Sequence, residues 1–228
     1  MTHADSQILP DTERVLPPVF DWFFASAKRL TVLIVLAVTA GTICYFAVDR
    51  PLAKWADTLS LSVNQLRQIV TRIGLSEWYL VTSGFLLFVY KLITRDPLPA
   101  WRSAVVLCCI GGSGLTVNLL KWIFGRYRPP MLLTEDQFGF AFFENGYMVH
   151  SFPSGHSATA ASLVVLGCMF IPRLRWLWLV MGLLIAMSRI FVGAHFASDI
   201  IAGWIVGLIF SIYVCRKLKA PVASVITD

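Results

Sequence analysis

Charged side chains are scarce in this chain. Among its 228 residues only 14% are Asp, Glu, Lys or Arg, whereas 57% are hydrophobic, and the mean hydropathy is +0.71. A typical soluble domain carries about 25% charged residues, so the composition excludes an ordinary soluble fold. The length is sufficient for one domain. The chain is therefore predicted to be an integral membrane protein.

Other common signals are also missing. The five cysteines all lie in apolar stretches without a CxxC pair, so neither a disulfide framework nor a zinc site is indicated. The N-terminus lacks the basic region, short apolar core and small-residue cleavage site of a cleaved signal peptide. The net charge is +6, but the basic residues form small groups beside apolar runs. That pattern is typical of membrane topology signals and argues against a nucleic-acid partner.

Long apolar runs are what the chain does contain. Those long enough to cross roughly 30 Å of hydrocarbon lie at residues 30–48, 78–94, 102–121, 155–171, 175–193 and 199–216. We therefore expect an all-α fold, a bundle of six membrane-spanning helices.

The runs also define the predicted organisation of the chain. A polar segment at 1–27 precedes a six-span membrane domain at 28–219, and a tail follows at 220–228. Residues 51–73 mix apolar and charged side chains, which predicts an amphipathic helix lying on the membrane surface. Residues 122–154 are predicted to be a loop that carries part of the functional site.

Basic residues orient this bundle. They are more numerous on one side of the membrane if both termini are cytoplasmic, especially when the basic residues of the polar motifs described below are set aside. In this topology the third span ends, the fourth begins, the fifth ends and the sixth begins at the same membrane face. Three polar segments are therefore expected to meet there.

The first polar segment is KWIFGRYRP, at residues 121–129. Lys121 closes the third predicted span, and Arg128 precedes two prolines that stop a helix. Arg128 offers a planar pair of donors and Lys121 a point charge, so the two can bind different oxygens of one phosphate. A cluster of cations snorkelling at the membrane boundary is the alternative interpretation.

The second segment is PSGH, at residues 153–156, immediately before the fourth predicted span. Ser154 can cap the helix, and Gly155 lets a ligand approach the backbone. The free amides and dipole of a helix N-terminus favour an anion, and His156 would stand beside it as a proton donor. A capping turn with an incidental histidine is the alternative.

The third segment is SRIFVGAHFASD, at residues 188–199. Arg189 lies late in the fifth predicted span, where an arginine requires a partner or an aqueous cavity, and it is predicted to be a third phosphate ligand. His195 and Asp199 are four positions apart, a spacing that places both on one helical face. The carboxylate can then hold one imidazole nitrogen and leave the other free for phosphorus. A structural His–Asp pair is the alternative.

Convergence of the three segments favours an oxyanion site with two histidines. The patterns K-x6-RP, PSGH and SR-x5-H-x3-D also match, position for position, the signature of the type 2 phosphatidic acid phosphatase superfamily. The chain resembles this superfamily over about residues 115–207. The resemblance implies a six-helix membrane phosphatase that acts without a metal or other cofactor.

The resemblance also implies roles for individual residues. His195 would be the nucleophile that forms a phosphohistidine, and Asp199 would orient it. His156 would protonate the leaving oxygen and then help to activate water. The residues expected to bind the phosphate are Lys121, Arg128, Ser154, Gly155 and Arg189.

Partners and location follow from the same resemblance. The expected partners are the bilayer and a phosphorylated lipid in a bacterial inner membrane, with the site facing the periplasm. Bacterial members of the superfamily act on lipid A, undecaprenyl pyrophosphate, phosphatidylglycerophosphate or phosphatidic acid. The motifs do not choose among these, although envelope lipids such as lipid A or the prenyl pyrophosphate are favoured. No oligomeric state is predicted.

Three rival functions share parts of this pattern. His156, His195 and Asp199 could form a metal site of two histidines and one carboxylate, giving a metal-dependent hydrolase, but the surrounding cations would repel a divalent ion. A nonenzymatic protein that binds lipid phosphate would not need the proton-transfer groups. A vanadate-dependent oxidase would share the anion-binding residues.

Some residues near the motifs lie outside the signature. Arg126 is interpreted as a contact for a headgroup or a second phosphate, with an interfacial anchor as the alternative. His150 is interpreted as a surface-loop histidine. The phenylalanines between 138 and 143 could line an acyl-chain entrance or anchor the loop at the interface.

Overall fold

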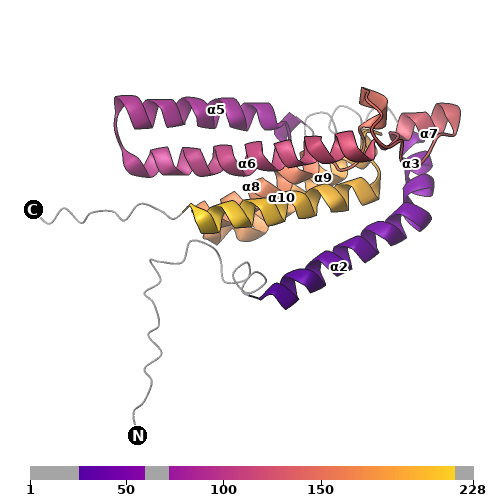
Figure 1. Ribbon diagram of the computed structural model, residues 1–228, viewed down its shortest axis with the longest axis horizontal. Coiled ribbons are helices and arrows are strands. Elements are labelled where there is room, and N and C mark those ends of the chain that lie inside the picture. The colour runs from indigo at the N-terminus through magenta and orange to yellow at the C-terminus, as the bar shows by residue number, and fades with distance from the viewer. Residues whose placement is uncertain (1–25, 60–71, 219–228) are drawn as a thin grey trace, which may run out of the picture.

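The computed structural model describes residues 26–59 and 72–218 (Figure 1). Predictions for most of the N-terminal segment, for much of 51–73 and for the tail at 220–228 lie outside the described residues. The described residues form helices and turns, and no strand occurs among them. The α-helices are α2 (Ala27–Ile43), α3 (Asp49–Asp57), α5 (Ser76–Phe88), α6 (Pro97–Phe124), α7 (Pro129–Glu135), α8 (Gly155–Phe170), α9 (Arg175–Phe191) and α10 (Ala197–Lys217).

Short helical turns of other types complete the architecture. π-helical turns at Cys44–Val48 and Val89–Ile93 continue α2 into α3 and extend α5. 3₁₀ turns occupy Tyr147–Val149 and Pro172–Leu174. Helices thus cover nearly all of the six predicted spans, which confirms the all-α membrane fold.

The count of six spans is not confirmed. Four described helices are long and apolar enough to cross a membrane: the continuous helix Ala27–Asp57 and the helices Pro97–Phe124, Pro172–Phe191 and Ala197–Lys217. Helix α8 is apolar but has only 16 residues. At 1.5 Å per residue it is about 24 Å long, less than the roughly 30 Å of a typical hydrocarbon core.

The predicted loop at 122–154 is more ordered than expected. Helix α6 continues to Phe124, and a further helix, α7, begins directly at Pro129. The sequence indicates only that the two prolines stop a helix. Proline also suits the first position of a helix, because its missing N–H would have no intrahelical partner there, so the same residues end one helix and permit the next.

Gly125 makes the turn out of α6. It has a φ of +51°, and its N–H donates to the carbonyl of Lys121, closing the helix. A Cβ at this position would lie 2.2 Å from the carbonyl oxygen of Ala141. Only glycine combines this left-handed conformation with so close an approach, and the chain is thereby directed into the segment that carries Arg126 and Arg128.

The core lies among α6, α8 and α10. Buried hydrophobic residues from all three helices, including Val105, Val165 and Ile212, pack into one cluster. Helix α10 approaches α8 so closely that a Cβ on Gly207 would lie 2.2 Å from the carbonyl oxygen of Ala158, and one on Gly203 would lie 2.2 Å from that of Ser154, the N-cap of α8. Small residues are typical of such tight packing between membrane helices. Helix α2, in contrast, buries none of its side chains and slants away from the bundle (Figure 1).

Candidate active site

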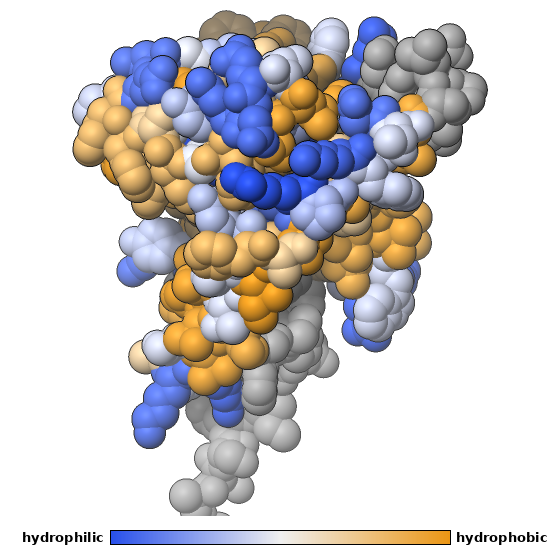
Figure 2. All heavy atoms as spheres, turned by 90° about the vertical axis from the view of Figure 1, so that its right-hand side faces the viewer, coloured by the Kyte–Doolittle hydropathy of each residue, from blue (hydrophilic) through white to orange (hydrophobic). Residues whose placement is uncertain are grey.

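The three polar segments meet at the end of the bundle that carries α3 and α7 (Figure 1). The amide of Ser154 donates to the carbonyl of Asp199 at 3.0 Å. Lys121 Nζ donates to the carbonyl of His150 at 2.7 Å, and Arg128 Nη1 donates to that of Ala194 at 3.3 Å. Figure 2 views this end and shows hydrophilic residues gathered among hydrophobic ones.

His195 and Asp199 form the predicted pair. Both are buried, and His195 Nδ1 lies 3.7 Å from Asp199 Oδ2. Asp199 Oδ2 also accepts hydrogen bonds from the amide of Phe196 at 2.9 Å and from Ser151 Oγ at 2.6 Å. Ser151 Oγ is itself 3.5 Å from His195 Nδ1. Ser151 was missed from the sequence because it lies just before the PSGH motif, and nothing in its local pattern distinguishes it from other serines.

His195 lies in the loop between α9 and α10, where burial favours its neutral form at pH 7. Burial lowers the pKa of His195 to about 3, and the neighbouring Lys121 and Arg128 act in the same direction against the opposing effect of Asp199. A neutral imidazole retains a lone pair on one nitrogen. His195 is therefore able to act as a nucleophile once its other nitrogen carries the proton.

Lys121, Arg128 and Arg189 bring positive charge to the same place. All three, together with His195, interact electrostatically with His156. None of the three cations forms an ion pair with a carboxylate among the described residues. Arg189 Nε and His156 Nε2 are both buried, and neither has a hydrogen-bond partner among the described residues. Unpaired cations beside unpartnered nitrogens are suited to binding an anion with several oxygens.

The PSGH segment starts α8 as the sequence predicts. Ser154 is the N-cap, and its Oγ accepts from the amide of Ser157 at 3.4 Å. A Cβ on Gly155 would meet no protein atom closer than 3.8 Å, so packing within the protein does not require glycine there. An approaching anion would give this position a reason to be glycine.

Arg126 is paired inside the protein and is not an exposed anchor at the membrane interface. The residue is completely buried, and its terminal nitrogens bind Asp49, Asp199 and Ser198. Phe138 and Phe140 of the 138–143 segment pack around its guanidinium. Phe140 also lines the apolar cleft described below, so the acyl-chain entrance stays a prediction. The sequence could not reveal the pairing of Arg126, because Asp49 lies 77 positions away in another helix.

His150 contributes its backbone to the site. Its carbonyl accepts from Lys121 and from Arg128 Nη2, so it orients two of the predicted phosphate ligands. The imidazole is half-buried, and its Nε2 has no hydrogen-bond partner among the described residues.

The geometry does not favour the rival metal site. Among residues 26–59 and 72–218, no three His, Cys, Asp or Glu side chains come close enough together to hold a metal ion. Asp199 is instead engaged by Arg126, Ser151 and the Phe196 amide.

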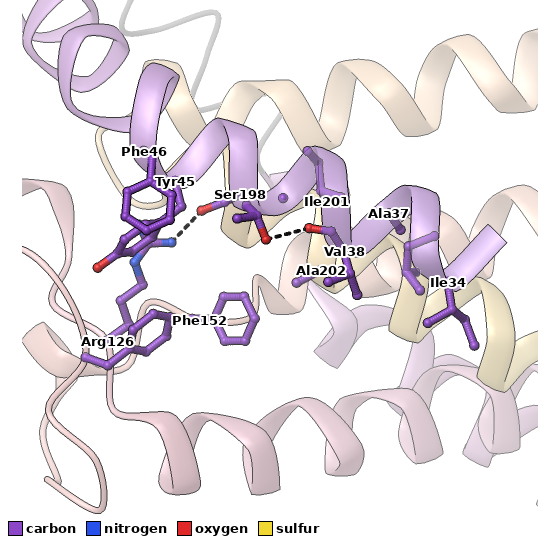
Figure 3. Close-up of a pocket in the computed structure, with 14 residues that line it drawn as sticks. Ile34, Ala37, Val38, Tyr45, Phe46, Arg126, Phe152, Ser198, Ile201 and Ala202 are labelled. Carbon is purple, nitrogen blue, oxygen red and sulfur yellow. Dashed lines mark hydrogen bonds between the residues drawn. The ribbon is translucent and has the colours of Figure 1, made fainter. Parts of the chain in front are cut away.

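An apolar cleft of about 560 Å³ lies between α2 and α10 (Figure 3). Ile34, Ala37 and Val38 line it from α2, and Ile201 and Ala202 line it from α10. Its polar end is formed by Arg126 and Ser198. The cleft therefore runs along two membrane helices and ends one residue from Asp199.

Comparison with known proteins identifies the family. The family model of the PAP2 superfamily matches residues 102–221, more than half of the chain, including all three polar segments. The chain belongs to the PAP2 superfamily. This membership confirms both the resemblance seen in the motifs and the predicted enzyme class, a lipid phosphatase.

Relatives of this PAP2 phosphatase include two named lipid A 1-phosphatases. That of Rhizobium etli is 32% identical over 187 residues, which cover 78% of this chain and 80% of that protein. That of Rhizobium johnstonii is 36% identical over 160 residues, 66% of each chain. The crystal structure of a transmembrane PAP2-type phosphatidylglycerolphosphate phosphatase from Bacillus subtilis matches with a TM-score of 0.57 at 24% identity, covering 82% of this chain and 92% of the other. The structural likeness shows a shared fold.

Proposed function

We propose that this PAP2 phosphatase removes a phosphate from a membrane lipid through a phosphohistidine on His195, and that its substrate is lipid A phosphorylated at position 1. The observation that carries the mechanism is a neutral, buried His195 beside Asp199, close to cations that have no carboxylate partner among the described residues. That combination supplies a nucleophile and a binding site for the phosphate group that the nucleophile attacks.

The first step transfers the phosphoryl group to the protein. His195 Nε2 attacks phosphorus while the bond between phosphorus and the lipid oxygen breaks on the opposite side. The negative charge of the bound phosphate favours a protonated His156. His156 gives its proton to the lipid oxygen, which leaves as a hydroxyl. Asp199 balances the positive charge that the imidazole gains, and Lys121, Arg128 and Arg189 stabilise the charge on the phosphoryl oxygens.

The second step releases phosphate. A water molecule attacks phosphorus, the nitrogen–phosphorus bond breaks, and one proton of the water passes to His156. The other remains on the phosphate. His195 is again neutral and His156 regains the proton that it gave in the first step, so the reaction needs no redox partner.

Two observations support lipid A over other phosphates. Both Rhizobium relatives are named for the 1-phosphate of lipid A. The apolar cleft between α2 and α10 ends at Arg126 and Ser198, and its volume falls within the roughly 300–1,000 Å³ of ligand pockets. An acyl chain in this cleft would direct its headgroup toward the end formed by Arg126 and Ser198, which are bonded to each other.

The proposed location is a bacterial inner membrane with the site facing the periplasm and both termini in the cytoplasm. The distribution of basic residues supports this orientation. The start of α2 and the end of α10 both point away from the site end of the molecule (Figure 1), as that orientation requires.

Phosphate release by purified protein in detergent tests the proposal. Wild type and His195→Ala are compared with EDTA present on lipid A, undecaprenyl pyrophosphate, phosphatidylglycerophosphate and phosphatidic acid. We expect lipid A to react fastest and the variant to lose on the order of a thousandfold in kcat. Wild-type turnover by the variant would remove His195 as nucleophile, and preference for another lipid would overturn the substrate assignment.

The same assay separates the rival functions. Loss of activity in EDTA that is restored by a divalent cation would favour the metal-dependent hydrolase. Lipid binding without phosphate release by the folded wild type would favour the nonenzymatic protein.

A further inference from the structure

A buried ionic network connects Asp49, the first residue of α3, to Asp199 on α10. Figure 3 shows its members Arg126 and Ser198. Arg126 Nη2 binds Asp49 Oδ2 at 2.8 Å, and its Nη1 binds Asp199 Oδ1. Nη1 also donates to Ser198 Oγ at 2.6 Å. All three charged side chains are completely buried. One guanidinium thus bridges two carboxylates from different helices.

Aromatic rings enclose this guanidinium. Its Cζ lies within 5.5 Å of four ring centroids, those of Tyr45, Phe138, Phe140 and Phe196. Charge–charge interactions are strong where water is excluded, and planar guanidinium groups stack well on aromatic faces. The surroundings therefore restrict Arg126 to one orientation.

Asp49 holds the network from the other side. It is the first residue of α3, and its Oδ1 accepts from the amide of Ser198 at 3.1 Å, while its Oδ2 accepts from the Ser198 hydroxyl. Ser198 lies in the first turn of α10, where a carboxylate is favoured by the free amides and the helix dipole. Asp49 consequently fixes both Arg126 and the start of the helix that presents Asp199.

The two oxygens of Asp199 are thereby assigned different tasks. Oδ1 binds Arg126, whereas Oδ2 accepts from Ser151 and the Phe196 amide and faces His195 Nδ1. A carboxylate can rotate about its Cβ–Cγ bond. Anchoring Oδ1 removes that freedom and leaves Oδ2 directed at the imidazole.

We propose that Asp49 and Arg126 are positioning residues for phosphoryl transfer: Asp49 holds Arg126, and Arg126 holds Asp199 in the orientation that supports His195. The inference rests on the proposed role of His195 as nucleophile. Asp49 lies outside residues 102–221, the part matched by the family model. The segment from α2 to α3 therefore contributes to the reaction itself as well as to the membrane-embedded surface.

Asp49→Asn is the first test, because it keeps the size of the side chain and leaves Arg126 paired with Asp199. We expect kcat to fall roughly ten- to a hundredfold, the range seen for outer groups that orient a functional imidazole. KM should stay within about twofold, since the phosphate ligands are untouched. Arg50→Gln is the matched control: Arg50 is the exposed neighbour, stacked on Phe138, and its loss should leave kcat unchanged.

A double-mutant cycle tests whether Arg126 acts through Asp199. Arg126→Gln and Asp199→Asn are each expected to lower kcat, and the combined variant should be no more than about twofold slower than Asp199→Asn alone. If the loss of kcat in the double variant equals the product of the two single losses, the inference is overturned, because Arg126 then acts independently of Asp199.

Folding and the two proposals can be separated. Thermal unfolding in detergent identifies variants that fail to fold, and if Arg126→Gln is one of them, the cycle is repeated with Asp49→Asn in its place. If His195→Ala remains active, the proposed nucleophile has failed. If His195→Ala is inactive but folded Asp49→Asn retains wild-type kcat, only the positioning inference has failed.

Discussion

At the scale of single residues, the site depends on how fully Asp199 is bonded. Its oxygens contact Arg126, Ser151, the Phe196 amide and His195. A buried carboxylate is stable as an ion only when its lone pairs are occupied in this way. The same bonds determine which oxygen faces His195, so stability of the charge and orientation of the imidazole have one origin.

Ser151→Ala should therefore impair catalysis. The variant removes a 2.6 Å hydrogen bond to Asp199 Oδ2, and a hydrogen bond to a charged group contributes about 1.5–3 kcal/mol. If that stabilisation is expressed in the transition state, kcat falls roughly ten- to a hundredfold with little change in KM, measured as phosphate release. Ser211→Ala is the control, because Ser211 is equally buried but bonds only within the core. Equal rates for the two variants would contradict the role of Ser151.

At the scale of elements, the packing of α10 on α8 brings two of the polar segments together. The amide of Ser154 donates to the carbonyl of Asp199, so the cap of one helix bonds the first turn of the other. This contact requires the two backbones to approach closely. Gly203 provides the approach one turn further along α10, directly opposite Ser154.

Gly203→Ala is predicted to damage both stability and activity. The added Cβ would lie 2.2 Å from the carbonyl oxygen of Ser154, which is backbone and cannot move alone. Overpacking of this kind costs about 1–3 kcal/mol, and it would displace Ser154 from the phosphate site. Gly84→Ala, on α5, is the matched control because its Cβ would meet nothing within 4 Å. Thermal unfolding and phosphate release of both variants check the prediction, which similar behaviour of the two would contradict.

The cleft between α2 and α10 makes a separate prediction about substrate binding. Ala37→Trp should fill part of the cleft and raise KM for long-chain lipid substrates severalfold, while hydrolysis of a short water-soluble phosphate ester should be unchanged. Val81→Trp, at an exposed position on α5, controls for adding a large side chain to the membrane surface. An unchanged KM for the lipid would show that acyl chains bind elsewhere.

At the scale of the whole molecule, the proposed catalytic residues lie at the opposite end of the bundle from the start of α2 and the end of α10 (Figure 1). The ends of α6 and α9 and the starts of α8 and α10 lie at one end of the bundle, and α10 finishes at the other (Figure 1). If the chain crossed the membrane an odd number of times between any two of these points, the motifs would lie on both membrane faces. Convergence of the motifs is thus a property of the topology and not of any single helix.

This arrangement predicts the location of the C-terminus. A green fluorescent protein fused after residue 228 should fluoresce in bacterial cells, whereas alkaline phosphatase fused there should be inactive, because both report a cytoplasmic location. A membrane-impermeant thiol reagent should label a cysteine introduced at Glu144, an exposed residue at the site end, in cells with a permeabilised outer membrane. Labelling only after lysis, or an active alkaline phosphatase fusion, would reverse the proposed orientation.

The sequence by itself determined the class of protein, the position of the apolar helices and the identity of the family. These properties depend on local composition and on spacing within short segments, as in KWIFGRYRP, PSGH and SRIFVGAHFASD. Hydropathy is a sum over neighbouring residues, and a motif is a fixed spacing along one chain segment. Neither depends on which residues pack against that segment in the folded protein.

Only the tertiary structure decided which groups surround the motif residues. Ser151 meets Asp199 across 48 positions, and Asp49 meets Ser198 across 149, distances over which no periodicity carries information. Arg126 stands in the same motif segment as Arg128, yet burial beside two carboxylates gives it a partner within the protein, whereas Arg128 has no carboxylate partner among the described residues. The physical reason is that charge pairing and burial are set by contacts between distant segments, which exist only once the helices have packed.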